Sequence, residues 1–352
     1  MKTCVIGAGY IAKQHLACLT RLPGVEVAGV CDLSPATAEA TAERFGVSRW
    51  FADHREMLSA VKPDVVHVAT PFNSHFALTM DALAAGAHVF VEKPVTPDYS
   101  QLQTLLARAR EAGSHVIEDH NYLFNGPVRR IVKLAESGEL GRVVHVEVTI
   151  CADLLAPGGR MADANAPHPA LAAPGGASME FLTHMAYLAH AFVGPHASVH
   201  THWPVCGPPE APLPGGELRA LVVAERGTAS LVFSGTAQPD AFSLRVHGTR
   251  ARAEAGMYEP RLIVQRVRGG PRPLVPLING LSEARGAARG AVGGLWRKLA
   301  GHAGPYEGLG ELLRRTYAAL RENREPPVGV RQIDEVNRLV ADLLDHRNRS
   351  GA

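Results

Sequence analysis

The chain lacks the cysteine pattern that a disulfide scaffold or a zinc ribbon needs. Its five cysteines are odd in number, and no two of them are spaced as a CxxC pair. It also lacks any uninterrupted apolar run that reaches the roughly 20 residues of a membrane span, and no secretory signal precedes the first predicted strand. We therefore expect a cytoplasmic protein with reduced cysteines, no metal and no membrane span.

An excess of charge of one sign is also missing, because the formal net charge is only +2 over 352 residues. This balance gives no reason to expect nucleic acid as a partner. The hydrophobic content of 46% is enough for two domains of ordinary size, each with a core of its own.

Segment 280–303 departs from this balance. It is rich in Gly and Ala and sets four basic residues against one acid, with Arg285, Arg289, Arg297 and Lys298 against Glu283. The pattern is compatible with a site for a phosphorylated or nucleotide-linked substrate, with a partner subunit or with a membrane surface. It is equally compatible with a surface excursion that binds nothing, and the sequence leaves these alternatives open.

Short apolar runs alternate with amphipathic stretches over the first third of the chain. The runs occupy residues 4–6, 25–31, 65–69, 88–91 and 115–118, and helical patterns occupy 11–22, 35–45, 73–85 and 97–112. Strands separated by helices of this length form βαβ units and a parallel sheet. We predict an α/β fold whose first domain, residues 1–121, is a Rossmann domain.

The rhythm changes after residue 121. A helical pattern at 127–137 leads into strands with period-2 alternation, and a second helical pattern covers about 177–192. Such strands are typical of an antiparallel sheet with one solvated face. Residues 122–352 are therefore predicted to form an α+β domain with a large open antiparallel sheet. Its C-terminal helices, at 311–322 and 333–346, are free to pack back on the first domain.

A glycine-rich turn follows the first predicted strand and opens the first helix. Gly7, Gly9 and Ala12 have the GxGxxA spacing of a dinucleotide fingerprint, with Tyr10 and Ile11 between them. Gly7 permits the tight turn, Gly9 lets the backbone approach a pyrophosphate, and Ala12 allows helix and strand to pack closely. Because a strand precedes the turn and a helix follows it, the pattern predicts a dinucleotide site.

Asp32 ends the second predicted strand, a little over 20 residues after the fingerprint. A carboxylate there accepts hydrogen bonds from the adenosine ribose and repels a 2′-phosphate, so NAD is preferred over NADP. The alternative is that Asp32 only caps the turn before Pro35.

Glu92-Lys93-Pro94 directly follows the strand at 88–91. Ligands of an open parallel sheet lie beyond the carboxyl ends of its strands, so Lys93 is aimed at the same crevice as the glycine turn. A lysine beside a nicotinamide can polarise a substrate hydroxyl and relay its proton. A surface lysine at a strand end is the alternative for this tripeptide alone.

Together these motifs resemble the Gfo/Idh/MocA oxidoreductase family, named for glucose–fructose oxidoreductase and inositol dehydrogenase. The resemblance covers nearly the whole chain and continues in three further motifs, at 138–141, at Gly175-Gly176 and at Glu180 with His184. It implies that Asn121 closes the site at the domain junction. It also implies that further side chains contact the cofactor, namely Thr70, Pro71, Asn73, His75, Glu92 and Lys93.

The resemblance makes His184 the proton acceptor for the substrate hydroxyl. Glu180 stands where the family usually has Asp, and Tyr187 stands where another Asp is common. On a helix Glu180 and His184 share one face, so the carboxylate can bind substrate or tune the imidazole. The same pair could instead be structural, or ligate a metal, although no third ligand is evident in the sequence. We take Lys93, His184 and Glu180 as the catalytic set.

Substrate contacts are expected from Tyr122 and from the long loop at 156–176, through Arg160, Asn165 and His168. A solvated connection is the alternative for that loop. We predict an NAD-dependent oxidoreductase acting on a secondary hydroxyl of a sugar, cyclitol or nucleotide-linked sugar. A redox-neutral epimerase or glycoside-cleaving enzyme would use the same residues, and a non-catalytic NAD-binding regulator is a further alternative. The resemblance also implies a homodimer or homotetramer.

Overall fold

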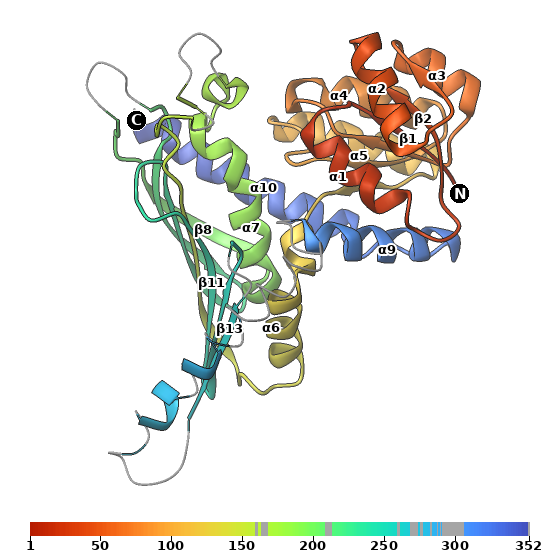
Figure 1. Cartoon of the computed structure of the whole chain (residues 1–352). Coiled ribbons are helices and arrows are strands. Elements are labelled where there is room, and N and C mark those ends of the chain that lie inside the picture. Colours follow the sequence, from red (N-terminus) through yellow and green to blue (C-terminus); the bar gives the residue numbers. More distant parts are fainter. Residues whose placement is uncertain are drawn as a thin grey trace. The chain divides into compact units, whose positions relative to one another are not determined.

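The computed structural model describes residues 1–350 apart from 159–160, 163–167, 208–212, 259–260, 268–273, 275–276, 282–283, 287, 289 and 291–305. The chain divides into two compact units (Figure 1). Unit 1 comprises residues 1–121 and 309–337, and unit 2 comprises residues 122–308 and 338–352. Most of segment 280–303 lies outside the described residues.

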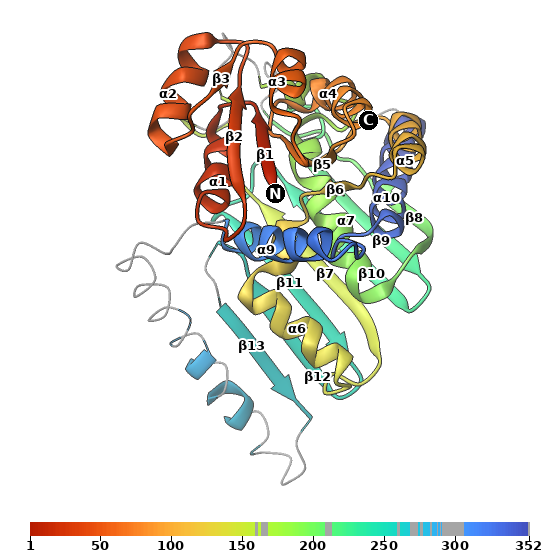
Figure 2. The same ribbon diagram turned by 90° about the vertical axis from the view of Figure 1, so that its right-hand side faces the viewer.

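Unit 1 is built on a six-stranded parallel sheet of order β3-β2-β1-β4-β5-β6, which confirms the predicted Rossmann-type sheet. Figure 2 shows β1 and β2 side by side. The four residues of β4 are all buried, as expected of a central strand covered on both faces. The strands are β1 (Lys2–Ile6), β2 (Glu26–Cys31), β3 (Trp50–Phe51), β4 (Val65–Val68), β5 (His88–Val91) and β6 (Val116–Glu118).

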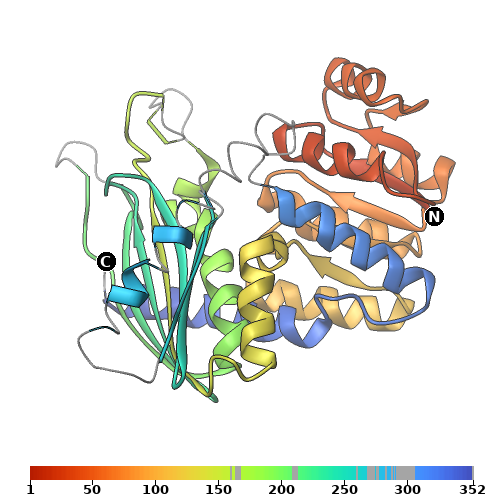
Figure 3. The same cartoon turned by 60° about the horizontal axis from the view of Figure 1, so that its bottom comes forward.

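Helices α2 and α5 of unit 1 begin at side-chain caps. The side chain of Ser34 accepts the N–H of Thr37 at the start of α2, and Asp98 accepts the N–H of Ser100 at the start of α5. Part of α9 lies along this sheet (Figure 3). The helices are α1 (Tyr10–Leu19), α2 (Pro35–Phe45), α3 (His54–Val61), α4 (His75–Ala84), α5 (Tyr99–Ala112), α9 (Glu307–Arg321) and α10 (Val330–Ser350).

Two elements of unit 1 were not predicted. Strand β3 has only two residues, too few for alternation to be recognised, and it pairs at the edge of the sheet. Helix α3 has eight residues and owes its start to Asp53, whose carboxylate accepts two backbone N–H groups. Together they complete a βα step between β2 and β4.

Unit 2 is built on a seven-stranded sheet of order β13-β12-β11-β7-β10-β9-β8. Neighbouring strands are antiparallel except β7 and β10, which pair in parallel. The prediction of an open antiparallel sheet is confirmed for every pair but that one. The strands are β7 (Val143–Cys151), β8 (His196–His202), β9 (Glu217–Ala224), β10 (Gly227–Ser234), β11 (Ala241–Gly248), β12 (Ala251–Gly256) and β13 (Arg261–Arg266).

One face of the sheet in unit 2 carries α6 (Gly126–Glu136) and α7 (Met179–Val193), which Figure 1 shows along the sheet seen nearly edge-on. Eleven residues of α7 are buried, so this helix lies at the centre of the unit's core. In the parts of the chain that the structure describes, no helix combines the length and apolarity needed to cross a membrane.

Candidate active site

The turn after β1 places glycine where no side chain fits. Gly7 has a φ of +99°, and a Cβ atom on it would lie 2.5 Å from the carbonyl oxygen of Ala69. Gly9 is the N-cap of α1, has no side-chain hydrogen bond to the helix, and would carry a Cβ with nothing within 4 Å. The helix N-terminus therefore has both backbone donors and space, as binding of a phosphate requires.

The three residues that follow Gly9 differ in exposure. The side chain of Tyr10 is 61% exposed, Ile11 is half-buried, and Ala12 is fully buried where α1 packs on the sheet. A small residue at position 12 thus allows the close helix–strand packing that the fingerprint predicts.

Asp32 ties the end of β2 to the glycine turn. One carboxylate oxygen accepts the N–H of Ala8 and the other accepts the N–H of Ser34, both at 2.9 Å. Asp32 therefore caps the turn before Pro35, as the alternative expects, while the side chain of Ser34 caps helix α2. The two oxygens are held at the edge of the turn, and the contact with a ribose stays a prediction.

His75 connects the ends of two neighbouring strands. Its ring nitrogens lie 2.8 Å from the carbonyl oxygens of Thr70, after β4, and Pro94, after β5. The ring is buried, whereas Pro71 and Asn73 are exposed on the intervening turn. His75 therefore bridges the ends of two neighbouring strands, and its contact with the cofactor stays a prediction.

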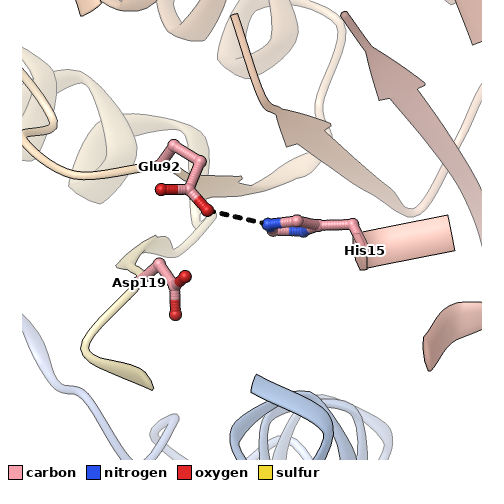
Figure 4. Close-up of side chains that lie close together, drawn as sticks. All are labelled: His15, Glu92 and Asp119. Atoms are coloured by element: carbon pink, nitrogen blue, oxygen red, sulfur yellow. Dashed lines mark hydrogen bonds and ion pairs between the residues drawn. The ribbon is translucent and has the colours of Figure 1, made fainter. Parts of the chain in front are cut away.

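Lys93 lies two residues after the end of β5, is half-buried, and is joined to Pro94 by a cis peptide bond. The adjacent Glu92 is buried and lies 3.0 Å from His15 Nε2 on α1, with Asp119 close by (Figure 4). A carboxyl oxygen of Asp119 lies within 4.8 Å of a carboxyl oxygen of Glu92. The predicted catalytic lysine thus stands beside a buried carboxyl pair that the sequence analysis did not identify.

The carboxyl pair divides its protons unequally. Burial opposes ionisation of Glu92, but the hydrogen bond and charge of His15 and the charge of Lys93 bring its pKa below the ordinary value. Burial and the Glu92 carboxylate raise the pKa of Asp119 well above its ordinary value. Of the two carboxyl groups, Asp119 therefore holds a proton more readily than Glu92.

His15, Glu92 and Asp119 place nitrogen and oxygen atoms within 4.8 Å of one another. Three such atoms at this spacing could ligate a metal ion, so the expectation of no metal stays a prediction. The charge of Lys93 also acts on both carboxyl groups and lowers the pKa of each.

In unit 2, His184 is held by a phenol from its own helix. The ring of His184 is 8% exposed, and its Nδ1 lies 2.8 Å from the hydroxyl oxygen of Tyr187, which also accepts the N–H of Tyr122 at 3.2 Å. An imidazole can take up a proton at Nε2 when its Nδ1 carries hydrogen and donates to that oxygen. Tyr187 is therefore the residue that orients the predicted proton acceptor.

Aromatic rings surround this imidazole. Tyr122 meets the ring of His184 edge-on at a centroid distance of 4.8 Å, and Phe242 on β11 lies 4.7 Å from Tyr122. Tyr258, at the end of β12, lies 5.9 Å from Phe242 and is 44% exposed. Aromatic rings packed edge-to-face in this way offer apolar surface that suits the C–H faces of a sugar ring. Tyr122 was predicted as a substrate contact, whereas Phe242 and Tyr258 were missed because they come from distant strands.

The start of α7 is fixed by a crossing of two glycine-containing segments. Gly176 has a φ of +56°, and a Cβ on it would collide with the carbonyl oxygen of Pro214. The N–H groups of Ala177 and Ser178 donate to the carbonyls of Pro214 and Gly215. This crossing determines where the helix that carries His184 begins.

The remaining predicted residues have mixed placements. Glu180 is half-buried in the first turn of α7, and Asn121 is buried as the last residue of the first stretch of unit 1. His168 accepts the N–H of Ala170 and so caps a short 3-10 helix. Arg160 and Asn165 lie outside the described residues.

The residues present fit a dinucleotide. Gly7 leaves no room for a side chain, Gly9 leaves open space at the N-terminus of α1, and a carboxylate is held at the end of β2. Gly7, Gly9 and Ala12 would hold the pyrophosphate, and Asp32 the adenosine ribose.

Comparison with known proteins gives a consistent result for both units. Residues 1–120 match a family described as "Oxidoreductase family, NAD-binding Rossmann fold", and residues 128–254 match the GFO/IDH/MocA C-terminal domain. A solved structure of the WlbA dehydrogenase from Bordetella pertussis, in complex with NADH and UDP-GlcNAcA, has the same fold. Its TM-score is 0.77 at 19% identity, covering 100% of this chain and 96% of that one.

Curated relatives match only part of their length. D-glucoside 3-dehydrogenase of Escherichia coli (strain K12) is 33% identical over 144 residues, which is 41% of this chain and 41% of that protein. Glycosyl hydrolase family 109 protein 2 of Akkermansia muciniphila is 26% identical over 42% of this chain and 33% of that protein. The chain thus aligns with less than half the length of either relative.

Proposed function

The chain belongs to the GFO/IDH/MocA family of NAD-binding oxidoreductases, and from this we propose that it oxidises a secondary hydroxyl of a sugar, cyclitol or nucleotide-linked sugar with NAD. The observation that carries the proposal is the imidazole of His184, buried among aromatic rings and held through Nδ1 by Tyr187. An oriented base in an apolar pocket is what abstraction of a hydroxyl proton needs.

Bound NAD⁺ supplies the hydride acceptor at nicotinamide C4. The ammonium of Lys93 donates a hydrogen bond to the substrate hydroxyl oxygen and so weakens its O–H bond. His184 takes that proton at Nε2 as the C–H bond gives up its hydride, leaving a ketone, NADH and one proton. Glu180 and Tyr122 hold the remaining hydroxyl groups of the sugar.

NAD is the preferred cofactor in this proposal. Both oxygens of Asp32 already accept backbone N–H groups, which fixes a negative charge at the end of β2. A 2′-phosphate brought there would be repelled. The outer face of β9 exposes Leu221 and Val223, which supports the further proposal that the chain forms a homodimer or homotetramer.

The test is an assay of NAD⁺ reduction by the purified full chain, measured as the increase in NADH absorbance. The substrates are a panel of free sugars, glycosides, cyclitols and nucleotide sugars. Lys93→Ala and His184→Asn should each lower kcat at least about 100-fold while NAD⁺ still binds. Lys133→Ala and His200→Asn, exposed residues of unit 2, serve as matched controls. NAD⁺ binding without turnover of any substrate would favour a regulator.

A redox-neutral reaction is the second candidate, because the Akkermansia muciniphila relative is named a glycosyl hydrolase. In that case the same residues remove hydride and return it, so product forms without accumulation of NADH. Product analysis of the same panel by mass spectrometry, run beside the absorbance assay, separates the two reactions.

A further inference from the structure

Five side chains of unit 1 form a continuous hydrogen-bonded line from the carboxylate beside Lys93 to a backbone carbonyl. We call Glu92, His15, His67, Tyr317 and Thr3 the relay. Glu92 Oε1 lies 3.0 Å from His15 Nε2, the two histidine Nδ1 atoms lie 2.9 Å apart, and His67 Nε2 lies 2.9 Å from the Tyr317 hydroxyl. That hydroxyl contacts Thr3 Oγ1, which lies 3.2 Å from the carbonyl oxygen of Val65.

The relay is closed to solvent. Thr3, His15, His67 and Tyr317 are 0% exposed and Glu92 is 6% exposed. They come from four strands and helices far apart in the sequence, and the last partner, the Val65 carbonyl, can only accept a hydrogen bond. A proton therefore enters or leaves at the Glu92 end alone, so the relay can store a proton but cannot conduct one through the unit.

Hydrogen-bond counting gives the four links between the relay side chains two arrangements. In the first, Thr3 donates to Tyr317 and gives up its hydrogen bond to the Val65 carbonyl, while Tyr317 donates to His67, His67 to His15 and His15 to the carboxylate. In the second, the hydrogens beyond His15 point toward the Val65 carbonyl, so His15 Nδ1 donates to His67. The second arrangement holds one proton more, placed between His15 and Glu92.

The extra proton cannot move deeper into the relay. Burial, helped by the charge of His15, holds the pKa of His67 well below its ordinary value. Burial also raises the pKa of Tyr317 above its usual range, so the phenol stays neutral. The charged and titratable groups that act electrostatically on the relay are Lys93, Asp119 and His75 at the carboxylate end, and Cys4, Asp64 and Arg321 at the phenol end.

We propose that the relay stores one proton beside Lys93, and that His15 and His67 are positioning residues that set the charge of the Glu92–His15 end during the reaction. The inference rests on the proposed function for its kinetic consequences. Without the stored proton a net negative charge stands beside Lys93 and favours its ammonium form. With the proton stored that charge is neutralised, so the lysine loses part of its electrostatic support.

The kinetic test is the pH profile of kcat/KM for variants of the full chain. His67→Phe removes the acceptor for His15 while filling the space between Phe90 and Tyr317, whose rings stack on His67 at 5.0 and 6.0 Å. It should move the acid limb of the profile to lower pH by about one unit and leave KM unchanged. In His15→Gln the relay cannot store a proton, so the part of the acid limb that is due to the stored proton should disappear from the pH profile.

His115→Gln is the matched control, because His115 is a partly buried histidine of unit 1 outside the relay. Its profile should coincide with that of the unchanged protein. Equal profiles for His67→Phe and the unchanged protein would overturn the proposal.

A spectroscopic test separates this proposal from the proposed function. Histidine-selective ¹⁵N labelling of the full chain with bound NAD⁺ reports ring protonation without any turnover. Between about pH 5 and pH 9, one titration should change the signals of two rings together, and His67→Phe should abolish that coupling. A stoichiometric metal in the purified protein that disappears with His15→Gln would overturn the proposal. If the two rings titrate together but no substrate is turned over, the relay proposal is supported and the proposed dehydrogenase function is contradicted.

Discussion

Two residues show how far chemistry at single positions can be read from the sequence. Gly7 was predicted from spacing alone, and its positive φ and the nearby Ala69 carbonyl supply the physical reason. Tyr187 was noted only as a departure from the family, yet its hydroxyl is the partner of His184. The sequence analysis paired His184 with Glu180 because i,i+4 residues share a helix face. Residues at i,i+3 share it too, so spacing alone could not choose between the two.

Gly7→Ala should abolish NAD⁺ binding. The added Cβ would meet the Ala69 carbonyl at 2.5 Å, and alanine at a φ of +99° is strained. The turn must therefore shift away from the position that receives the pyrophosphate. Calorimetric titration with NAD⁺ measures the loss, and Gly46→Ala, at a helix end with open space around it, controls for strain alone. Unchanged affinity in Gly7→Ala would contradict the assignment of this turn.

Tyr187→Phe should lower kcat by about 10- to 100-fold, because an imidazole without its orienting partner presents Nε2 less well to the substrate. KM should change little, since the ring and its packing remain. Steady-state kinetics on the best substrate measures the effect. Tyr99→Phe removes another phenolic hydroxyl, bonded to Asp334 in unit 1, and should leave kcat unaltered. A wild-type kcat for Tyr187→Phe would mean that this hydroxyl does not orient the base.

At the scale of elements, long periodic segments were predictable and short or topological features were not. Helices α2, α5 and α7 lie where the pattern places them, whereas β3 and α3 are too short for periodicity to be recognised. The parallel pairing of β7 with β10 could not be read from alternation, because alternation is the same in either direction. Phe242 and Tyr258 reach His184 only through that sheet.

Gly176→Ala should destabilise the start of α7. Alanine in this left-handed conformation costs about 1–3 kcal/mol, and its Cβ would also collide with the Pro214 carbonyl. Thermal unfolding should therefore begin at lower temperature, and kcat should fall because His184 lies on the same helix. Gly86→Ala, which has a similar φ but open space, isolates the cost of the backbone conformation. Equal melting of the two variants would argue against the collision.

For the whole molecule, the fold class and the family were predictable because motifs at several strand ends agree. The relay could not be predicted, because its members are far apart in the sequence. His15 and His67 are 52 residues apart, and His67 and Tyr317 are 250 residues apart. Each of the three looks like an ordinary helix or strand residue in the sequence. Only packing brings their polar atoms together, and their burial then requires that each be hydrogen-bonded.

Acidification should lower the stability of the folded chain. Burial lowers the pKa of His67 and, against two carbonyl contacts, that of His75. A histidine with a lowered folded pKa binds fewer protons than its unfolded form, so its stabilisation is complete above about pH 6.5 and lost as pH falls. Each contributes a slope of up to about 1.4 kcal/mol per pH unit in that window.

Melting temperature measured from about pH 8 to about pH 5 should therefore decline, and the decline should be shallower in His67→Phe. Parallel curves for the two proteins would show that His67 is protonated as easily in the folded chain as in the unfolded one.

The position of Tyr317 has a consequence for biosynthesis. Thr3 and His67 leave the ribosome early, but the phenol that joins them is made only after nearly nine-tenths of the chain. Until then Thr3 and His67 each lack one of the hydrogen-bond partners that they have in the folded chain, and the surface that α9 covers stays open to chaperones and proteases. Deletion of the C-terminal helices would therefore destabilise unit 1. The residues of those helices that belong to unit 1 begin at 309, almost 200 residues after the unit's first stretch ends at 121.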